Sequence, residues 1–281
     1  MGYLETISLL DDVELYIIGD LIDRGHDSYR ILYDIKNRIE KNNRIKIHYL
    51  AGDHELIMYQ ALKEKKPGES VSVWSDWLLE GGGMIDGIID SLPNADQDYE
   101  ELKQFLSKLK IFQVLDEKIN NKNIVLVHAK CPDNIEKELR LKEDNKEIFN
   151  ILYTRKKDFL GRNHKLGKEG YFTIIGHTPN KEGFSIVEEN VLGIDGGCGP
   201  YAMGHFEYQH VPLVEVKEDS LNILLFNHNN EITQGYSYNG NLKKIEEQKL
   251  NKERMLLIHR YDNQEEYYKD KILEYKKILK M

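Results

Sequence analysis

The stretch VELYIIGD, residues 13–20, is an apolar run of the kind that forms a buried strand, and it ends in Asp20. Three later runs have the same form and also end in a residue that can bind a metal: IKIHYLAGD at residues 45–53, NIVLVH at residues 123–128 and YFTIIGH at residues 171–177. Sites in open α/β sheets form at the carboxyl ends of the strands. The pattern therefore predicts that four side chains converge at one edge of a sheet: Asp20, Asp53, His128 and His177.

These four side chains make a donor set that favours a divalent transition metal. Two carboxylates and two imidazoles suit Mn, Fe or Zn, and the set lacks the thiolates of a structural zinc site. A single Asp or His after a strand is more often a turn residue or a satisfied polar group. Four such strand ends are difficult to explain in that way. In three of them a glycine precedes the metal-capable residue and permits a sharp turn out of the strand (Gly19, Gly52 and Gly176).

The rest of the chain alternates helical and strand-like stretches, which predicts an α/β fold. Apolar residues at helical spacing predict a helix from about Ser28 to Lys41, and residues 69–110 are predicted to form a helical cap inserted in the domain. Short strand-like runs separated by turns follow His177 and predict a second, more antiparallel sheet. We therefore expect one domain over residues 1–241. A charged helical tail over residues 242–281 would pack on this domain or bind a partner.

The composition excludes several classes of function. The chain has 281 residues and a formal net charge of −9 without a long basic stripe, so nucleic acid is not expected as a partner. It has neither an apolar run that could cross a bilayer nor a recognisable secretory signal, so we expect no membrane partner. The only cysteines are Cys131 and Cys198, which argues against a disulfide framework and favours a cytoplasmic location.

Two of the four strand ends lie in longer motifs that resemble those of a known family. GDLIDRG at residues 19–25 resembles the GDxxDRG signature of the phosphoprotein phosphatase branch of calcineurin-like metallophosphoesterases, and GDHE at residues 52–55 resembles that family's GNHE. VHA at residues 127–129 and GHTP at residues 176–179 resemble its later motifs, in the same order. Further stretches are similar to elements of the bacterial members, which include serine/threonine phosphatases and diadenosine tetraphosphatases: WLLEGGG at 77–83, LYTR at 152–155 and GIDGGCG at 193–199.

The resemblance covers about residues 2–216 and implies both a fold and a metal site. The implied fold is a calcineurin-like four-layer sandwich of two mixed β-sheets flanked by helices. Asp20 would bridge two divalent ions, with Mn²⁺ expected and Fe or Zn as alternatives. The second metal site would be completed by Asp53, His128 and His177, and the ions would activate a water for attack on phosphate.

The resemblance also assigns the residues that would handle the substrate. His54 would be the general acid that protonates the leaving group, and Asp23 would hold its ring and favour its charged form. Arg24 and Arg155 would bind phosphate oxygens, because the guanidinium fork matches their geometry. Arg155 lies in the charged run TRKKD, so a solvated surface role is its alternative.

The sequence departs from the family pattern at two positions. The family's DxHG motif, whose Asp and His bind the first metal, has no match here, since Gly2 aligns with its glycine and Met1 stands at its histidine. The chain is therefore expected to bind one or two ions, and we keep open a truncated start, a variant with one metal and a pseudoenzyme. The family's asparagine ligand is Asp53 here. Its negative charge would tighten the ion and lower its Lewis acidity, which predicts weaker catalysis than in a complete relative.

Three functions remain open from the sequence. The leading expectation is an enzyme that hydrolyses phosphate monoesters, with a phosphorylated protein or a small phosphoester as the substrate and phosphoserine or phosphothreonine as the favoured group. A diadenosine tetraphosphatase or another nucleotide hydrolase is the enzyme alternative. The third is an inactive pseudophosphatase that binds phosphorylated partners. The retained Asp23, Arg24 and His54 favour the active enzyme.

Overall fold

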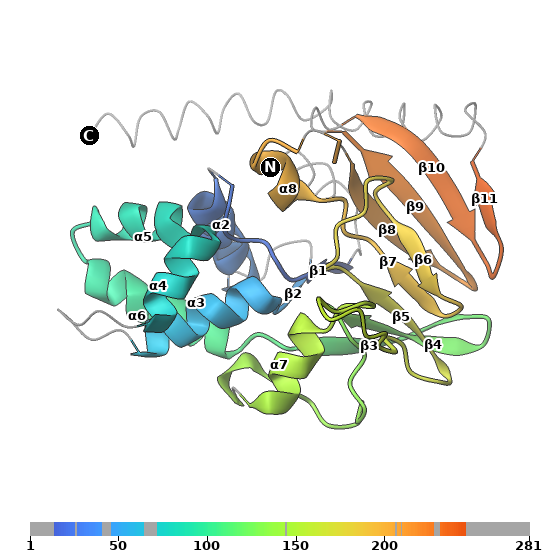
Figure 1. Cartoon of the computed structure of the whole chain (residues 1–281), viewed down its shortest axis with the longest axis horizontal. Helices are drawn as coiled ribbons and strands as arrows, with labels where there is room; N and C mark the ends of the chain where they lie inside the picture. Colours follow the sequence, from blue (N-terminus) through green and yellow to red (C-terminus); the bar gives the residue numbers. More distant parts are fainter. Residues whose placement is uncertain are drawn as a thin grey trace.

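The computed structural model describes residues 14–25, 27–40, 46–64, 72–143, 145–205, 207–208, 210–227 and 231–245. Within these residues the expected α/β fold is confirmed. Most helices gather on one side of the molecule and the two larger sheets on the other (Figure 1). No described helix is long and apolar enough to cross a lipid bilayer.

A parallel pair of strands opens the described chain. Strand β1 (Glu14–Ile18) pairs in parallel with β2 (Lys46–Leu50), and helix α2 (Ser28–Glu40) connects them. This is a βαβ unit, in which both strands run toward the same edge. The predicted helix after residue 28 is present, and it buries Leu32 and Ile35 of its apolar stripe. The unit therefore delivers the residues after β1 and β2 to one place.

A five-stranded mixed sheet carries the two histidines. Its order is β3-β4-β5-β7-β6, and β4 (Lys122–Val127), β5 (Tyr171–Ile175) and β7 (Val191–Gly193) are parallel to one another. Strand β3 (Phe112–Ile119) pairs antiparallel with β4, and β6 (Ser185–Glu188) pairs antiparallel with β7. We predicted that residues 185–193 would join the later antiparallel sheet. That was wrong, because β7 pairs in parallel with β5 and brings β6 with it.

Alternate residues of this sheet face two different cores. In β4, Ile124 and Leu126 pack with the second sheet, whereas Val125 and Val127 pack with the helices. Side chains of a strand point alternately to its two faces, so both faces of β4 are covered. The near-continuous apolar run of β4 in the sequence follows from this double burial.

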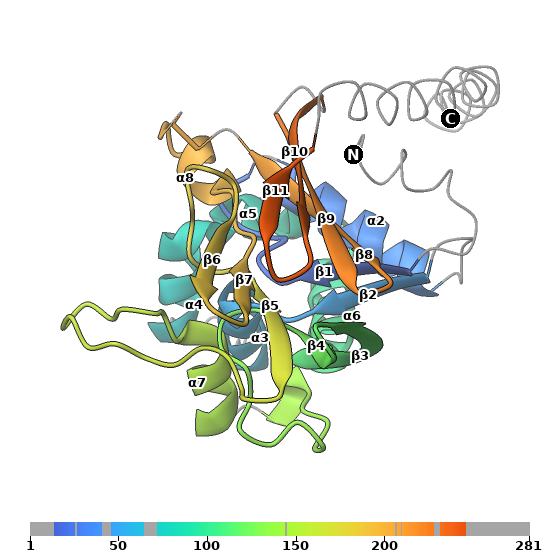
Figure 2. The same ribbon diagram turned by 90° about the vertical axis from the view of Figure 1, so that its right-hand side faces the viewer.

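The second sheet is antiparallel throughout, with the order β11-β10-β9-β8. It comprises β8 (Val211–Lys217), β9 (Ser220–Phe226), β10 (Ile232–Tyr238) and β11 (Leu242–Lys244). It packs through β9 against the mixed sheet, and Figure 2 shows the two sheets from a second side. The helical tail was predicted to begin at Leu242, but Leu242–Lys244 form a strand, because they pair antiparallel with β10. The remainder of the predicted tail, residues 246–281, lies outside the described residues.

The predicted cap is a run of short helices between β2 and β3. After α3 (Asp53–Glu64), the cap comprises α4 (Ser72–Trp77), the π-helical turn η1 (Leu78–Gly82), α5 (Gly83–Asp90) and α6 (Ala95–Ser107). Two further short helices, α7 (Lys146–Tyr153) and α8 (Cys198–Ala202), follow β4 and β7. Gly81 has φ of +112°, which breaks the helical path between α4 and α5.

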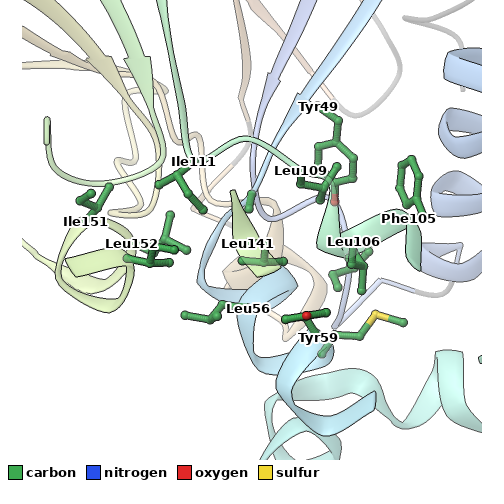
Figure 3. Packing of buried hydrophobic residues seen from close by; sticks show 14 of the residues in the cluster. Tyr49, Leu56, Tyr59, Phe105, Leu106, Leu109, Ile111, Leu141, Ile151 and Leu152 are labelled. Carbon is green, nitrogen blue, oxygen red and sulfur yellow. The ribbon is translucent and has the colours of Figure 1, made fainter. Parts of the chain in front are cut away.

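A continuous apolar core joins the cap to the sheet. Leu56 and Tyr59 of α3 pack with Leu106 of α6 and with Leu152 of α7 (Figure 3). Trp77 is completely buried in the same cluster. Since α3 begins at Asp53, this packing fixes the helix whose first turn reaches the site.

Candidate metal centre and phosphate site

The structure brings the four metal-capable residues together. One donor atom of each of Asp20, Asp53, His128 and His177 lies within 4.8 Å of all the others. The closest contact joins His128 Nε2 to Asp53 Oδ1 at 2.9 Å, and His177 Nδ1 lies 3.2 Å from the same oxygen. Asp20 Oδ1 is 3.3 Å from His128 Nε2. Residues separated by up to 157 positions therefore share one small polar cluster.

Tight backbone turns at the strand ends aim these side chains inward. Gly19 and Asp20 have φ of +75° and +54°, and His177 has φ of +66°. Positive φ is uncommon for residues other than glycine and is found where the surrounding structure imposes it. A Cβ at Gly19 would lie 2.6 Å from His128 Nδ1, so glycine is required there for the close approach. Two of the four metal-capable residues, Asp20 and His177, therefore lie on strained turns.

The carboxylate of Glu55 holds the same turns through hydrogen bonds to their backbone. It is completely buried and accepts four hydrogen bonds: from the backbone N–H groups of Asp20 (2.9 Å), Leu21 (3.1 Å) and Gly52 (2.7 Å), and from the Tyr49 hydroxyl (2.5 Å). Two of these donors belong to the turn after β1 and one to the turn after β2. Glu55 therefore ties together the two turns that carry Asp20 and Asp53.

The four clustered groups perturb one another strongly. Burial raises the pKa of Asp20 above its ordinary value, although His128 opposes this shift. Burial also acts to raise the pKa of Asp53, but its contacts with His128 and His177 outweigh that effect and lower it. Burial lowers the pKa of His177. At His128 the carboxylates of Asp20 and Asp53 outweigh burial and raise the pKa to about 10.

These residues fit a divalent cation. The donor set contains two carboxylates and two imidazoles, the mixture that Mn, Fe and Zn accept. The Nδ1 atom of His128 lies 2.9 Å from the Ile18 carbonyl oxygen, which takes its N–H and leaves Nε2 directed at the cluster. The Nε2 atom of His177 is buried without a hydrogen-bond partner among the described residues. A cation would supply the positive charge that the two carboxylates require.

Asp23 and His54 form a buried pair beside the cluster. His54 Nδ1 lies 2.7 Å from Asp23 Oδ2, and the Trp77 indole N–H donates to Asp23 Oδ1 at 3.2 Å. Burial acts to lower the pKa of His54, but Asp23 outweighs it and raises the pKa to about 9. The backbone N–H of His54 also donates to Asp20 Oδ1 at 3.5 Å. The pair thus favours a protonated His54 ring next to the metal-capable cluster.

The two arginines line the same cavity as the cluster. This cavity has a volume of about 1030 Å³, and its lining includes Arg24, Arg155, Tyr153 and both ends of the Asp23–His54 pair. Arg24 Nη2 donates to Glu80 Oε2 at 2.9 Å. Arg155 is exposed and makes no ion pair within the described part of the chain. Both guanidinium groups therefore line one cavity, and that of Arg24 shares one of its donors with Glu80.

Sequence reasoning missed three contacts of this site. Glu55 was taken only as the last letter of the GDHE motif, and nothing in a single sequence marks it as the acceptor for three backbone N–H groups. Trp77 was noted as the first letter of the WLLEGGG stretch. It is buried, and a buried indole N–H needs an acceptor, which could have pointed to a carboxylate such as Asp23. The pairing of Arg24 with Glu80 was not expected either.

Comparison with known families places the chain. A search among curated proteins finds no match. The family model for calcineurin-like phosphoesterases matches residues 3–209, which is more than half of the chain and includes all four clustered residues. The chain therefore belongs to the calcineurin-like phosphoesterase family.

Proposed function

We propose that this protein hydrolyses phosphate monoesters in a metal-dependent reaction, and that phosphoserine and phosphothreonine side chains of proteins are its substrates. One juxtaposition supports the proposal above all. A four-residue donor cluster for a cation lies next to a buried histidine that an aspartate holds in its protonated form. Phosphate ester hydrolysis needs both an electrophilic metal site and an acid for the leaving alkoxide.

The residues divide the work between binding and proton transfer. Asp20, Asp53, His128 and His177 would hold the metal, which when bound would polarise the phosphate and lower the pKa of the attacking water. Mn²⁺ is the ion that we expect. Arg24 and Arg155 would bind the non-bridging phosphate oxygens from the opening of the cavity.

His54 would donate its proton to the leaving oxygen of the substrate. Its Nδ1 faces Asp23, so its Nε2 is the atom left for the substrate. Although burial opposes the shift, the contact with Asp23 raises the pKa of His54, and this favours the protonated ring. The Trp77 indole fixes the second oxygen of Asp23, which holds the carboxylate plane and through it the imidazole. The backbone contact from His54 to Asp20 fixes this acid relative to the metal-capable cluster.

The proposal is tested by measuring metal content and turnover on the same protein. Metal per chain is determined by mass spectrometry, and hydrolysis of p-nitrophenyl phosphate and of a phosphoserine peptide is measured with and without Mn²⁺. His54→Asn is the informative variant. His48→Asn is its matched control, because His48 pairs with Glu14 on the β1–β2 sheet and does not line the cavity.

We expect bound metal and Mn²⁺-dependent turnover in the wild type and in His48→Asn. In His54→Asn we expect metal to be retained while turnover is lost. Bound metal without any turnover would contradict the proposal and favour the pseudophosphatase. Turnover of p-nitrophenyl phosphate without turnover of the phosphoserine peptide would contradict the proposed protein substrate.

A further inference from the structure

An ion pair joins the cap to the turn after β1, and it involves Arg24, one of the two proposed phosphate-binding groups. Glu80, in the turn η1, accepts a hydrogen bond from Arg24 Nη2 at 2.9 Å. The Arg24 side chain is 29% exposed and that of Glu80 is 50% exposed, so both face the opening of the cavity. The carboxylate is therefore fixed beside the place where a substrate phosphate would bind.

Two glycines allow the backbone to approach Arg24 closely on either side. A Cβ at Gly81, which follows Glu80, would lie 2.7 Å from the Arg24 backbone nitrogen and 3.0 Å from its Cγ. A Cβ at Gly199 would lie 3.1 Å from Arg24 Nη1. The arginine thus lies between the cap on one side and the start of α8 on the other. Such close packing limits where its guanidinium can go and keeps it in reach of Glu80.

The pairing leaves Arg24 able to bind one phosphate. Glu80 Oε2 takes a single N–H from Nη2, and a guanidinium group carries five donors. The remaining donors can still engage phosphate oxygens. The carboxylate, however, offsets the charge of Arg24 at the opening, so the opening has little surplus positive charge for a second phosphate.

The other charged residues of the cavity also disfavour a second phosphate. Outside the metal-capable cluster and the Asp23–His54 pair, the described lining contains two arginines, no lysine and four carboxylates: Arg24, Arg155, Asp27, Asp34, Glu80 and Asp195. Asp34 is paired with Arg38, and Asp195 accepts from a backbone N–H, so both are partly compensated. A polyphosphate chain needs several cations beyond the group that grips the reacting phosphate. Outside the metal-capable cluster and the Asp23–His54 pair, this lining has more carboxylates than arginines.

We infer that Glu80 is a specificity-determining residue that makes the cavity favour phosphate esters with cationic neighbours over those with further anionic groups. Under the proposed function, on which this inference rests, the preferred substrate is a phosphoserine or phosphothreonine flanked by basic residues. Phosphopeptides with acidic flanks and nucleoside polyphosphates are disfavoured. The carboxylate acts through its charge, by repulsion of a second anion and attraction of a cation.

The test compares two phosphoserine peptides of equal length, one flanked by arginines and one by aspartates, in Glu80→Gln. Glutamine keeps an oxygen that can accept from Arg24, so the substitution removes the charge and preserves the positioning contact. Glu100→Gln is the matched control. It removes the same charge from a side chain that is also 50% exposed and lies on the cap, but Glu100 does not line the cavity. Thermal unfolding establishes that all variants are folded.

We expect the wild type to prefer the arginine-flanked peptide in kcat/KM. Glu80→Gln should reduce the ratio of the two kcat/KM values by about three- to tenfold, as expected for one partly screened charge. Glu100→Gln should leave the ratio unchanged, and added salt should reduce the wild-type ratio toward that of Glu80→Gln. An unchanged ratio in Glu80→Gln, or a wild type that prefers the aspartate-flanked peptide, would overturn the inference.

The same ratio can be measured without turnover. Fluorescence anisotropy gives the dissociation constants of both labelled peptides in the presence of Mn²⁺, for His54→Asn alone and combined with Glu80→Gln or Glu100→Gln, since His54→Asn is expected to retain metal without hydrolysing the peptides. If p-nitrophenyl phosphate is not hydrolysed, the proposed function fails. The binding ratio then still decides the role of Glu80: a shift of about three- to tenfold in Glu80→Gln supports it, and equal ratios refute it.

Discussion

The buried carboxylate of Glu55 offers the sharpest test of how the site is held together. Its Oε1 accepts from the Leu21 N–H and the Tyr49 hydroxyl, and its Oε2 accepts from the N–H groups of Asp20 and Gly52. Glu55→Gln keeps the shape of the side chain but replaces one oxygen by an NH₂ group. That group cannot accept a hydrogen bond, so at least one buried N–H loses its acceptor.

The expected loss of stability follows from which oxygen is replaced. An NH₂ group at the Oε1 position leaves the Leu21 N–H without an acceptor, while the Tyr49 hydroxyl can turn and accept a hydrogen bond from the new NH₂ group. An NH₂ group at the Oε2 position instead leaves the N–H groups of Asp20 and Gly52 without an acceptor. Each buried donor without a partner costs about 1–3 kcal/mol. Relief of repulsion between Glu55 and the neighbouring Asp20 offsets part of this, so we expect the free energy of unfolding to fall by about 2 kcal/mol.

Urea unfolding in the presence of a chelator measures this difference without a contribution from bound metal. Tyr49→Phe is the control, because it removes one donor and leaves every backbone N–H with its acceptor. It should lower the free energy of unfolding by about 1 kcal/mol. Glu55→Gln should also weaken Mn²⁺ binding by about tenfold, since Glu55 holds the turns that carry Asp20 and Asp53. If Glu55→Gln is no less stable than Tyr49→Phe, Glu55 does not brace the site in the way described.

Four further outcomes are expected. His54→Asn should lower kcat by about 10²- to 10⁴-fold while metal content by mass spectrometry stays at the wild-type level; a parallel loss of metal would contradict a role in proton transfer. Trp77→Phe keeps an aromatic ring but removes the N–H that donates to Asp23, so kcat should fall by about two- to tenfold, and an unchanged kcat would refute the orienting role. His128→Ala should abolish the thermal stabilisation by Mn²⁺ seen in the wild type, and a retained shift would place the ion elsewhere. Asp53→Asn should raise kcat at saturating Mn²⁺ while weakening metal affinity, because the carboxylate charge lowers the Lewis acidity of the ion; a lower kcat would count against this reasoning.

The strand ends of the site could be predicted from the sequence because each is a local pattern. An apolar run followed by Asp or His is visible at residues 13–20, 45–53, 123–128 and 171–177, and the structure brings the four final residues within 4.8 Å. The topology rule for parallel strands accounts for the closeness of Asp20 to Asp53 and of His128 to His177. It does not account for the meeting of the two pairs, because β1–β2 and the five-stranded sheet are separate sheets.

Contacts between distant segments could not be predicted in the same way. The placement of β7 depends on pairing with β5 rather than on its own apolar residues, and β11 is three exposed residues that pair with β10. The partners of Glu55 and Glu80 are set by how α3 and the cap pack against the turn after β1. Their sequence neighbourhoods carry no period or motif that specifies those partners.

The most direct test of the central claim is anomalous diffraction from crystals soaked in Mn²⁺. We predict a manganese peak bounded by Asp20, Asp53, His128 and His177 and coordinated by their oxygen and nitrogen atoms. A peak bound elsewhere, or no peak with the four side chains turned apart, would contradict it.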